Sequence, residues 1–121
     1  MNKERLALKK DNEELRQNME NIQKERAKLY QDLGTAYTKA KYFDRAIDSY
    51  NKALAYDASN GEAHYYLGLL YEHSMADTEK ALYHLNEYMK LKPDEKTGQD
   101  VKYLIKMLRT ERAPGYEIPK H

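Results

Sequence analysis

The chain has 121 residues, of which 34% are charged, and its 21 Lys and Arg nearly balance its 20 Asp and Glu, for a formal net charge of +1. Binding to a nucleic acid or an anionic membrane surface uses an excess of positive charge, so we expect neither partner. The sequence has no cysteine, which excludes disulfides and thiolate catalysis and leaves only histidines and carboxylates for a metal site.

No apolar run approaches the roughly 20 residues of a membrane-spanning helix, and residues 1–15 lack the apolar core of a signal peptide. We therefore expect a soluble protein without a membrane span, in the cytoplasm or in a bacterial periplasm. The composition is rich in Ala, Leu, Glu, Lys and Tyr and has only 5 Gly and 3 Pro, which favours an all-α fold.

The N-terminal segment follows a heptad pattern and contains neither proline nor glycine before residue 34. Leucine or isoleucine recurs every seven residues at the d positions, and an a-position asparagine fixes the register of parallel dimers. We predict a coiled-coil oligomerisation helix over residues 1–26 that forms a homodimer, with a trimer as an alternative. The predicted oligomerisation residues are Leu8, Asn12, Leu15, Met19, Ile22 and Leu29.

The heptad pattern continues past residue 26 without a helix breaker, which predicts one long helix from about residue 3 to residue 40. Arg5 and Arg26 also fall at a positions and weaken the predicted contact between copies. A second interpretation is open, in which the N-terminal helix folds back over the rest of the chain as an extra capping helix.

A repeat follows in the sequence. Leu33, Gly34 and Tyr37 recur 34 residues later, and Ala46, Ile47 and Tyr50 recur 35 residues later as Ala, Leu and Leu. Apolar spacing predicts two helices in each of the units 27–60 and 61–95, and a fifth helix over 97–112. We expect Gly61 to stop a helix and Asp77 or Thr78 to begin one. Residues 113–121 contain two prolines and are predicted to form an extended tail.

Each unit has a glycine in the middle of its first helix, Gly34 and Gly68, where glycine costs roughly 1 kcal/mol relative to alanine. We expect close approach of the second helix to offset this cost. Small residues at the equivalent positions of the second helices, Ala46 and Ala81, are expected to present that close contact.

These residues closely resemble the tetratricopeptide repeat (TPR) over about 27–94. The resemblance implies an α-solenoid fragment of helix-turn-helix repeats, with residues 27–112 as the TPR domain and 97–112 as its capping helix. Two departures, His64 in place of a large aromatic and Tyr88 in place of a small residue, imply that His64 is a core residue and that helix 81–91 packs against 97–112. The matching residues are Tyr30, Leu33, Gly34, Tyr37, Ala46, Tyr50, Ala53, Leu67, Gly68, Tyr71, Ala81 and Pro93.

In this family the first helix of each repeat lines a concave groove that binds a protein or peptide. The alternative is that Tyr65 and Leu69 are covered by the chain's own cap or by a second subunit. The carboxylate clamp of chaperone adaptors in the family is missing, because its positions hold Gln31, Thr35, Tyr66 and Leu69. The matching groove positions are Lys28, Gln31, Thr35, Thr38, Lys39, Glu62, Tyr65, Leu69, Glu72 and His73.

No pattern of residues predicts catalysis, a cofactor or a metal site. The four histidines form no i, i+4 pair beside a carboxylate, and the sequence has no phosphate-binding glycine loop. The basic stripe of Lys102, Lys106, Arg109 and Arg112 is interpreted as a solvated helix face. We expect a non-catalytic, homo-oligomeric scaffold that binds a protein or peptide. The alternative is a structural assembly component whose repeats contact only other copies of the chain.

Overall fold

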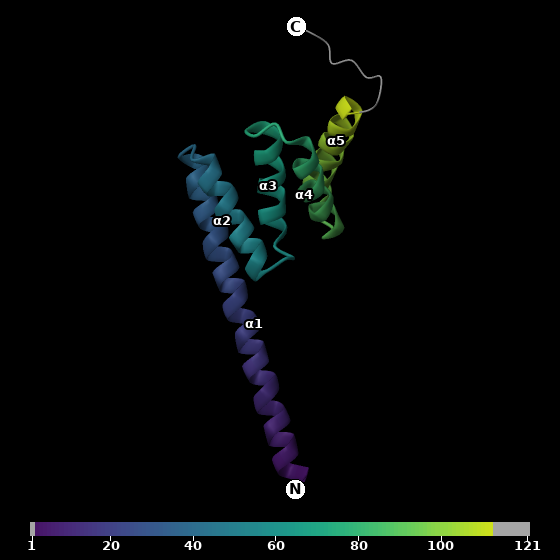
Figure 1. The fold of residues 1–121 in the computed structure, drawn as a ribbon. Coiled ribbons are helices and arrows are strands. Elements are labelled where there is room, and N and C mark those ends of the chain that lie inside the picture. Colours follow the sequence, from purple (N-terminus) through teal and green to yellow (C-terminus); the bar gives the residue numbers. More distant parts are fainter. Residues whose placement is uncertain (1, 113–121) are drawn as a thin grey trace.

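The computed structural model describes residues 2–112, and the side chains of residues 2–110. This part of the chain is helical without a strand, as predicted, and the predicted extended tail lies outside the described residues (Figure 1). The fifth helix begins two residues before the predicted start. The helices are α1 (Asn2–Lys39), α2 (Phe43–Tyr56), α3 (Gly61–His73), α4 (Thr78–Lys90) and α5 (Glu95–Arg112).

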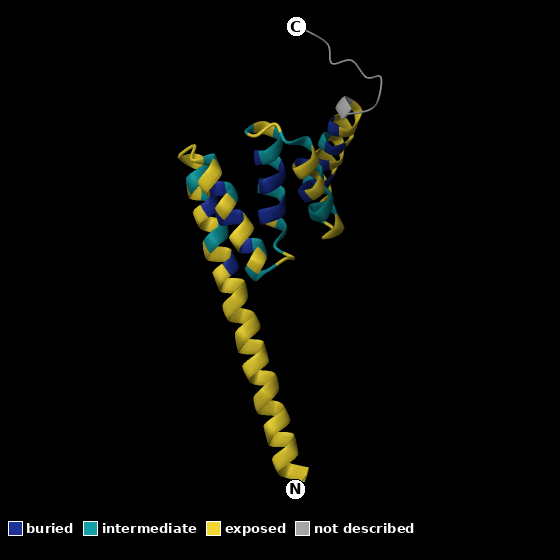
Figure 2. Ribbon diagram, in the orientation of Figure 1, coloured by how far each residue is buried: buried dark blue, intermediate teal, exposed yellow. Residues whose placement is uncertain are grey.

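Helix α1 is continuous over 38 residues, which confirms the predicted long N-terminal helix. Its second half packs along α2, whereas residues 2–26 are exposed and project away from the other helices (Figures 1 and 2). We call residues 2–26 the stem. The stem does not fold back over the repeats, so a core formed by the chain beyond residue 26 must stabilise the fold.

That core has two parts, one on each side of α3 (Figure 1). The first joins α1, α2 and α3, and the second joins α4 and α5, which is the packing expected for the capping helix. Helices α3 and α4 are extensively paired and connect the two parts. The buried side chains are Ala46, Tyr50, Ala53, Ala63, Leu67 and Leu70 in the first part and Ala81, Leu85, Val101, Ile105 and Leu108 in the second.

The mid-helix glycines allow close contact between paired helices, but not through the alanines named in the sequence interpretation. A Cβ atom on Gly34 would lie 2.8 Å from the ring of Tyr50. A Cβ atom on Gly68 would lie 2.6 Å from Cδ2 of Leu85, while the Ala81 backbone oxygen would be 3.5 Å away. Each glycine therefore makes room for a large buried side chain one turn beyond the expected alanine.

Side-chain caps fix the starts of the two helices of the second repeat. The Asn60 side chain accepts a hydrogen bond from the Ala63 backbone N–H (3.1 Å), and Asp77 accepts one from that of Lys80 (3.1 Å). The choice of Asp77 as a helix start is confirmed. The interpretation of Gly61 as a helix stop is wrong, because the Asn60 cap makes Gly61 the first residue of α3.

Two buried histidines face each other between α3 and α4. Nδ1 of His64 lies 3.1 Å from Nδ1 of His84, and Nε2 of His64 lies 3.0 Å from the Ala58 carbonyl oxygen. A carbonyl only accepts, so Nε2 of His64 donates to Ala58, and one of the two Nδ1 atoms donates to the other. Burial, and then repulsion from His64, lowers the pKa of His84 to about 4. His64 is a core residue, as the sequence predicted.

Candidate protein-binding groove

A hollow of about 460 Å³ opens between the C-terminal end of α1 and helix α3. Apolar side chains form most of its surface, and polar groups lie toward the C-terminal end of α3. A partner segment could place an aliphatic or aromatic side chain here. We call this hollow the groove, and it is lined by Thr38, Phe43, Tyr66, Leu69, Leu70, Glu72, His73 and Ser74.

A stack of tyrosines supports the groove wall from inside. Gly34 leaves space for the Tyr50 ring, which stacks on Tyr66 with ring centroids 5.6 Å apart. The Thr35 hydroxyl donates to the Gln31 backbone oxygen (3.1 Å), so the Tyr50 hydroxyl, 3.0 Å away, donates to Thr35. Burial raises the pKa of Tyr50, although the bond to Thr35 opposes this change. The ring of Tyr66 is therefore held by a hydrogen-bonded, protonated neighbour.

A polar network ties α1 to the turn before α3. The Gln31 side-chain amide donates to Glu62, and its oxygen accepts from Nδ2 of Asn60 (3.1 Å). Since Asn60 also caps α3, this network fixes the orientation of α3 against α1. Gln31 and Glu62 line a second hollow, next to Tyr88 and the turn that precedes α5.

The structure brings four of the predicted groove residues together in the groove: Thr38, Leu69, Glu72 and His73. The others lie apart from it. Gln31 and Thr35 form the internal bonds described above, and Lys39 is exposed at the end of α1. Tyr65 packs against Tyr88 of α4, with ring centroids 5.1 Å apart, and against the second core.

The predicted groove lining leaves out its aromatic part, Phe43 and Tyr66, although Tyr66 occupies one of the clamp positions. Tyr66 precedes Leu69 by three residues, a spacing that places both on one helix face and could have revealed it. Phe43 is the first residue of α2. Nothing in the repeat comparison pointed to it, since the residue 35 positions later is Thr78.

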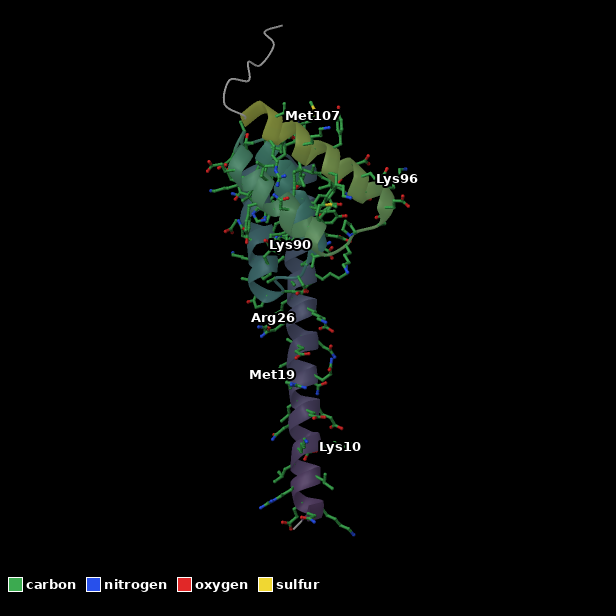
Figure 3. All side chains as sticks on the ribbon, turned by 90° about the vertical axis from the view of Figure 1, so that its right-hand side faces the viewer. Lys10, Met19, Arg26, Lys90, Lys96 and Met107 are labelled. Atoms are coloured by element: carbon green, nitrogen blue, oxygen red, sulfur yellow. The ribbon has the colours of Figure 1, made fainter. Side chains whose placement is uncertain are left out.

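The predicted oligomerisation residues form an exposed apolar seam along α1. Leu8, Leu15, Met19 and Leu29 are each more than 60% exposed, and Ile22 is 48% exposed. Figure 3 shows the side chains of Lys10, Met19 and Arg26 projecting from α1 below the other helices. We call the stripe formed by Leu8, Asn12, Leu15, Met19, Ile22 and Leu29 the seam.

The seam and the groove use different sides of the same helix. At about 100° per residue, Gln31 lies about 200° around the helix from Leu29, and Thr38 lies about 180° from it. The seam residue Leu29 is exposed, whereas Thr38 is half-buried against the groove. Occupation of the seam therefore leaves the α1 side of the groove open.

Within residues 2–112, no group of three or more His, Asp or Glu is placed to hold a metal ion. No helix in the described range combines the length and apolar character needed to cross a membrane.

Paired antiparallel helices that repeat after 34 or 35 residues, with glycine facing a large side chain in each pair, define the architecture. Residues 34–74 match the family described as TPR repeat. Residues 34–74 therefore carry the tetratricopeptide repeat. It is also similar to the anaphase-promoting complex subunit cut9 of Schizosaccharomyces pombe, with 32% identity over 75 residues. The match covers 62% of this chain but only 11% of that protein's length. TPR repeats form a protein-interaction module.

Proposed function

We propose that this TPR chain is a non-catalytic scaffold that associates with copies of itself through the seam and captures a protein or peptide in the groove. The observation that carries the proposal is the placement of both surfaces on different sides of one unbroken helix. Association would then present two or more grooves at once, which raises avidity without any new contact.

The chemistry of the groove favours a particular kind of segment. Phe43, Tyr66 and Leu69 offer an apolar surface, and Glu72 adds a carboxylate at one end. A peptide with an aliphatic or aromatic anchor followed by a basic residue fits this surface. Apolar anchors in a pocket carry most of the binding free energy in such complexes.

We expect Leu69→Glu to abolish partner capture, because the carboxylate would lose water on binding and would lie close to Glu72. The measurement is quantitative mass spectrometry of proteins retained by the immobilised full chain and its variants. The matched control is Tyr83→Glu on the exposed side of α4, which should retain the same proteins. Undiminished capture by folded Leu69→Glu would place the binding site outside the groove.

By light scattering, we expect the unchanged chain to have the mass of a dimer and the double variant Leu15→Glu, Ile22→Glu to have the mass of a monomer. Two carboxylates in the seam would face their own copies across a parallel contact and repel them. A control pair on the other side of the stem, Glu13→Lys and Glu20→Lys, should leave the dimer intact.

A mass of 14.3 kDa for the unchanged chain at high concentration would refute association through the seam. A mass that keeps growing with concentration would instead support the structural assembly alternative, in which repeats contact one another.

A further inference from the structure

Another hollow, of about 550 Å³, lies between α4 and α5 on the capping side of the repeats. Its floor is apolar, with Met89 half-buried and Ile105 buried. Three cations, Lys102, Lys106 and Arg109, form its α5 rim, and among the side chains of residues 2–110 no carboxylate lines it. We call this site the cap hollow; its lining is completed by Asn86 and Thr110.

The repeat spacing shows what kind of element fits the cap hollow. The 34-residue shift carries Gly68 to Lys102 and Tyr71 to Ile105, and the 35-residue shift carries Leu54 to Met89. In α2 and α3 the corresponding residues border α4. Gly68 accommodates Leu85, Tyr71 stacks on His84 with ring centroids 5.7 Å apart, and Leu54 lines a hollow together with His84.

The cap hollow therefore occupies the place where one more helix would stand against α4 and α5. Its charge differs from that of the preceding repeat, because a lysine replaces the glycine. Lys102, Lys106 and Arg109 lie at i, i+4 and i+7, which places them along one stripe of α5. Among the side chains of residues 2–110, none of the three is in an ion pair, so their charges are available to a partner.

We propose that the cap hollow binds an acidic amphipathic helix of a partner protein. The apolar side of that helix rests on Met89 and Ile105, and its carboxylates at i, i+4 and i+7 face the three cations. Helix-in-groove recognition uses this combination of spaced apolar anchors and flanking charges. Charge complementarity selects the partner and speeds encounter, while the apolar floor holds the bound helix.

The test uses a fluorescent synthetic 18-residue helical peptide, with a leucine stripe flanked by glutamates at i, i+4 and i+7, and the full chain. We expect anisotropy titrations to show binding that weakens as salt is added. A second peptide with lysines in place of the glutamates should not bind. The variant Lys102→Glu, Lys106→Glu, Arg109→Glu should bind the acidic peptide at least about tenfold more weakly.

A control of equal charge change, Lys10→Glu, Lys24→Glu, Lys96→Glu, should bind as the unchanged chain does. Equal loss in this control would overturn the proposal by showing that only net charge matters. Met89→Gln should weaken binding without changing its salt dependence. All substituted lysines and arginines are exposed, and circular dichroism checks that each variant is folded.

Absence of binding by the acidic peptide would also overturn the proposal. A different occupant would give another result, because the stem carries acidic residues beside its seam, including Asp11 and Glu14. If a second copy's stem fills the cap hollow, the triple variant Lys102→Glu, Lys106→Glu, Arg109→Glu should have a lower assembly mass in solution without any peptide. That outcome would replace the partner helix with a self-association contact.

Discussion

Replacing Gly68 with alanine should lower the free energy of unfolding by about 1–3 kcal/mol, even though alanine is the better helix former. The added Cβ would lie 2.6 Å from Cδ2 of Leu85, a distance that real Cβ contacts essentially never show. Leu85 is fully buried in the second core, and close packing in protein interiors opposes its movement. Urea unfolding followed by circular dichroism measures the change.

The matched control is Gly98→Ala in α5, where the nearest atom, Cγ of Pro93, would be at an ordinary 3.6 Å. This variant should be stabilised by up to about 1 kcal/mol, because it gains helix propensity without a clash. Combining Gly68→Ala with Leu85→Ala should cost less than the sum of the two single changes. If Gly68→Ala stabilised the chain as Gly98→Ala does, the close contact between α3 and α4 would be refuted.

Acidification from pH 6.5 to pH 4 should lower the free energy of unfolding by about 2 kcal/mol through His84. Its pKa is lowered in the folded chain from 6.5 to about 4, mainly by burial. In this window the unfolded chain binds a proton that the folded chain does not, so stability falls as the pH falls. If the whole pKa difference contributed, the free energy of unfolding would fall by about 3 kcal/mol. His84 also lines a hollow that water can enter, which reduces this change.

The test compares urea midpoints across this pH range for the unchanged chain, His84→Phe and His73→Gln. His84→Phe should flatten the pH dependence, because the buried titrating group is gone. His73 is exposed at the end of α3, so its replacement should leave the pH dependence unchanged. Equal slopes in the unchanged chain and in His84→Phe would show that the buried histidine does not control acid stability.

The helical framework could be predicted because its determinants are local in sequence. Apolar spacing and the 34-residue recurrence of Gly34 place the helices, and Asp77 marks the start of α4. The fifth helix begins at Glu95, ahead of its predicted start, because its apolar stripe begins only after its first turn. Helix boundaries depend on such polar first-turn residues, which carry no periodic apolar signal.

The candidate sites could be predicted only in part, because side-chain contacts between helices depend on how the helices are rotated. Comparison with the family's repeat positions placed Leu69 and Glu72 in one groove, where both lie in the structure. It could not show that Tyr65 turns toward Tyr88. The pairing of His64 with His84 joins residues 20 positions apart on different helices, a distance at which no sequence periodicity operates. The seam, in contrast, needed only the heptad spacing within one helix.

Because α1 is unbroken, it fixes how far the repeats are rotated about the helix axis relative to the stem. A straight helix of 38 residues is about 57 Å long, and it contains no proline or internal joint to absorb a twist. Whatever binds the stem therefore also sets the direction in which the repeats face. Each residue inserted near position 26 would advance the repeats by about 1.5 Å and turn them by about 100° relative to the stem.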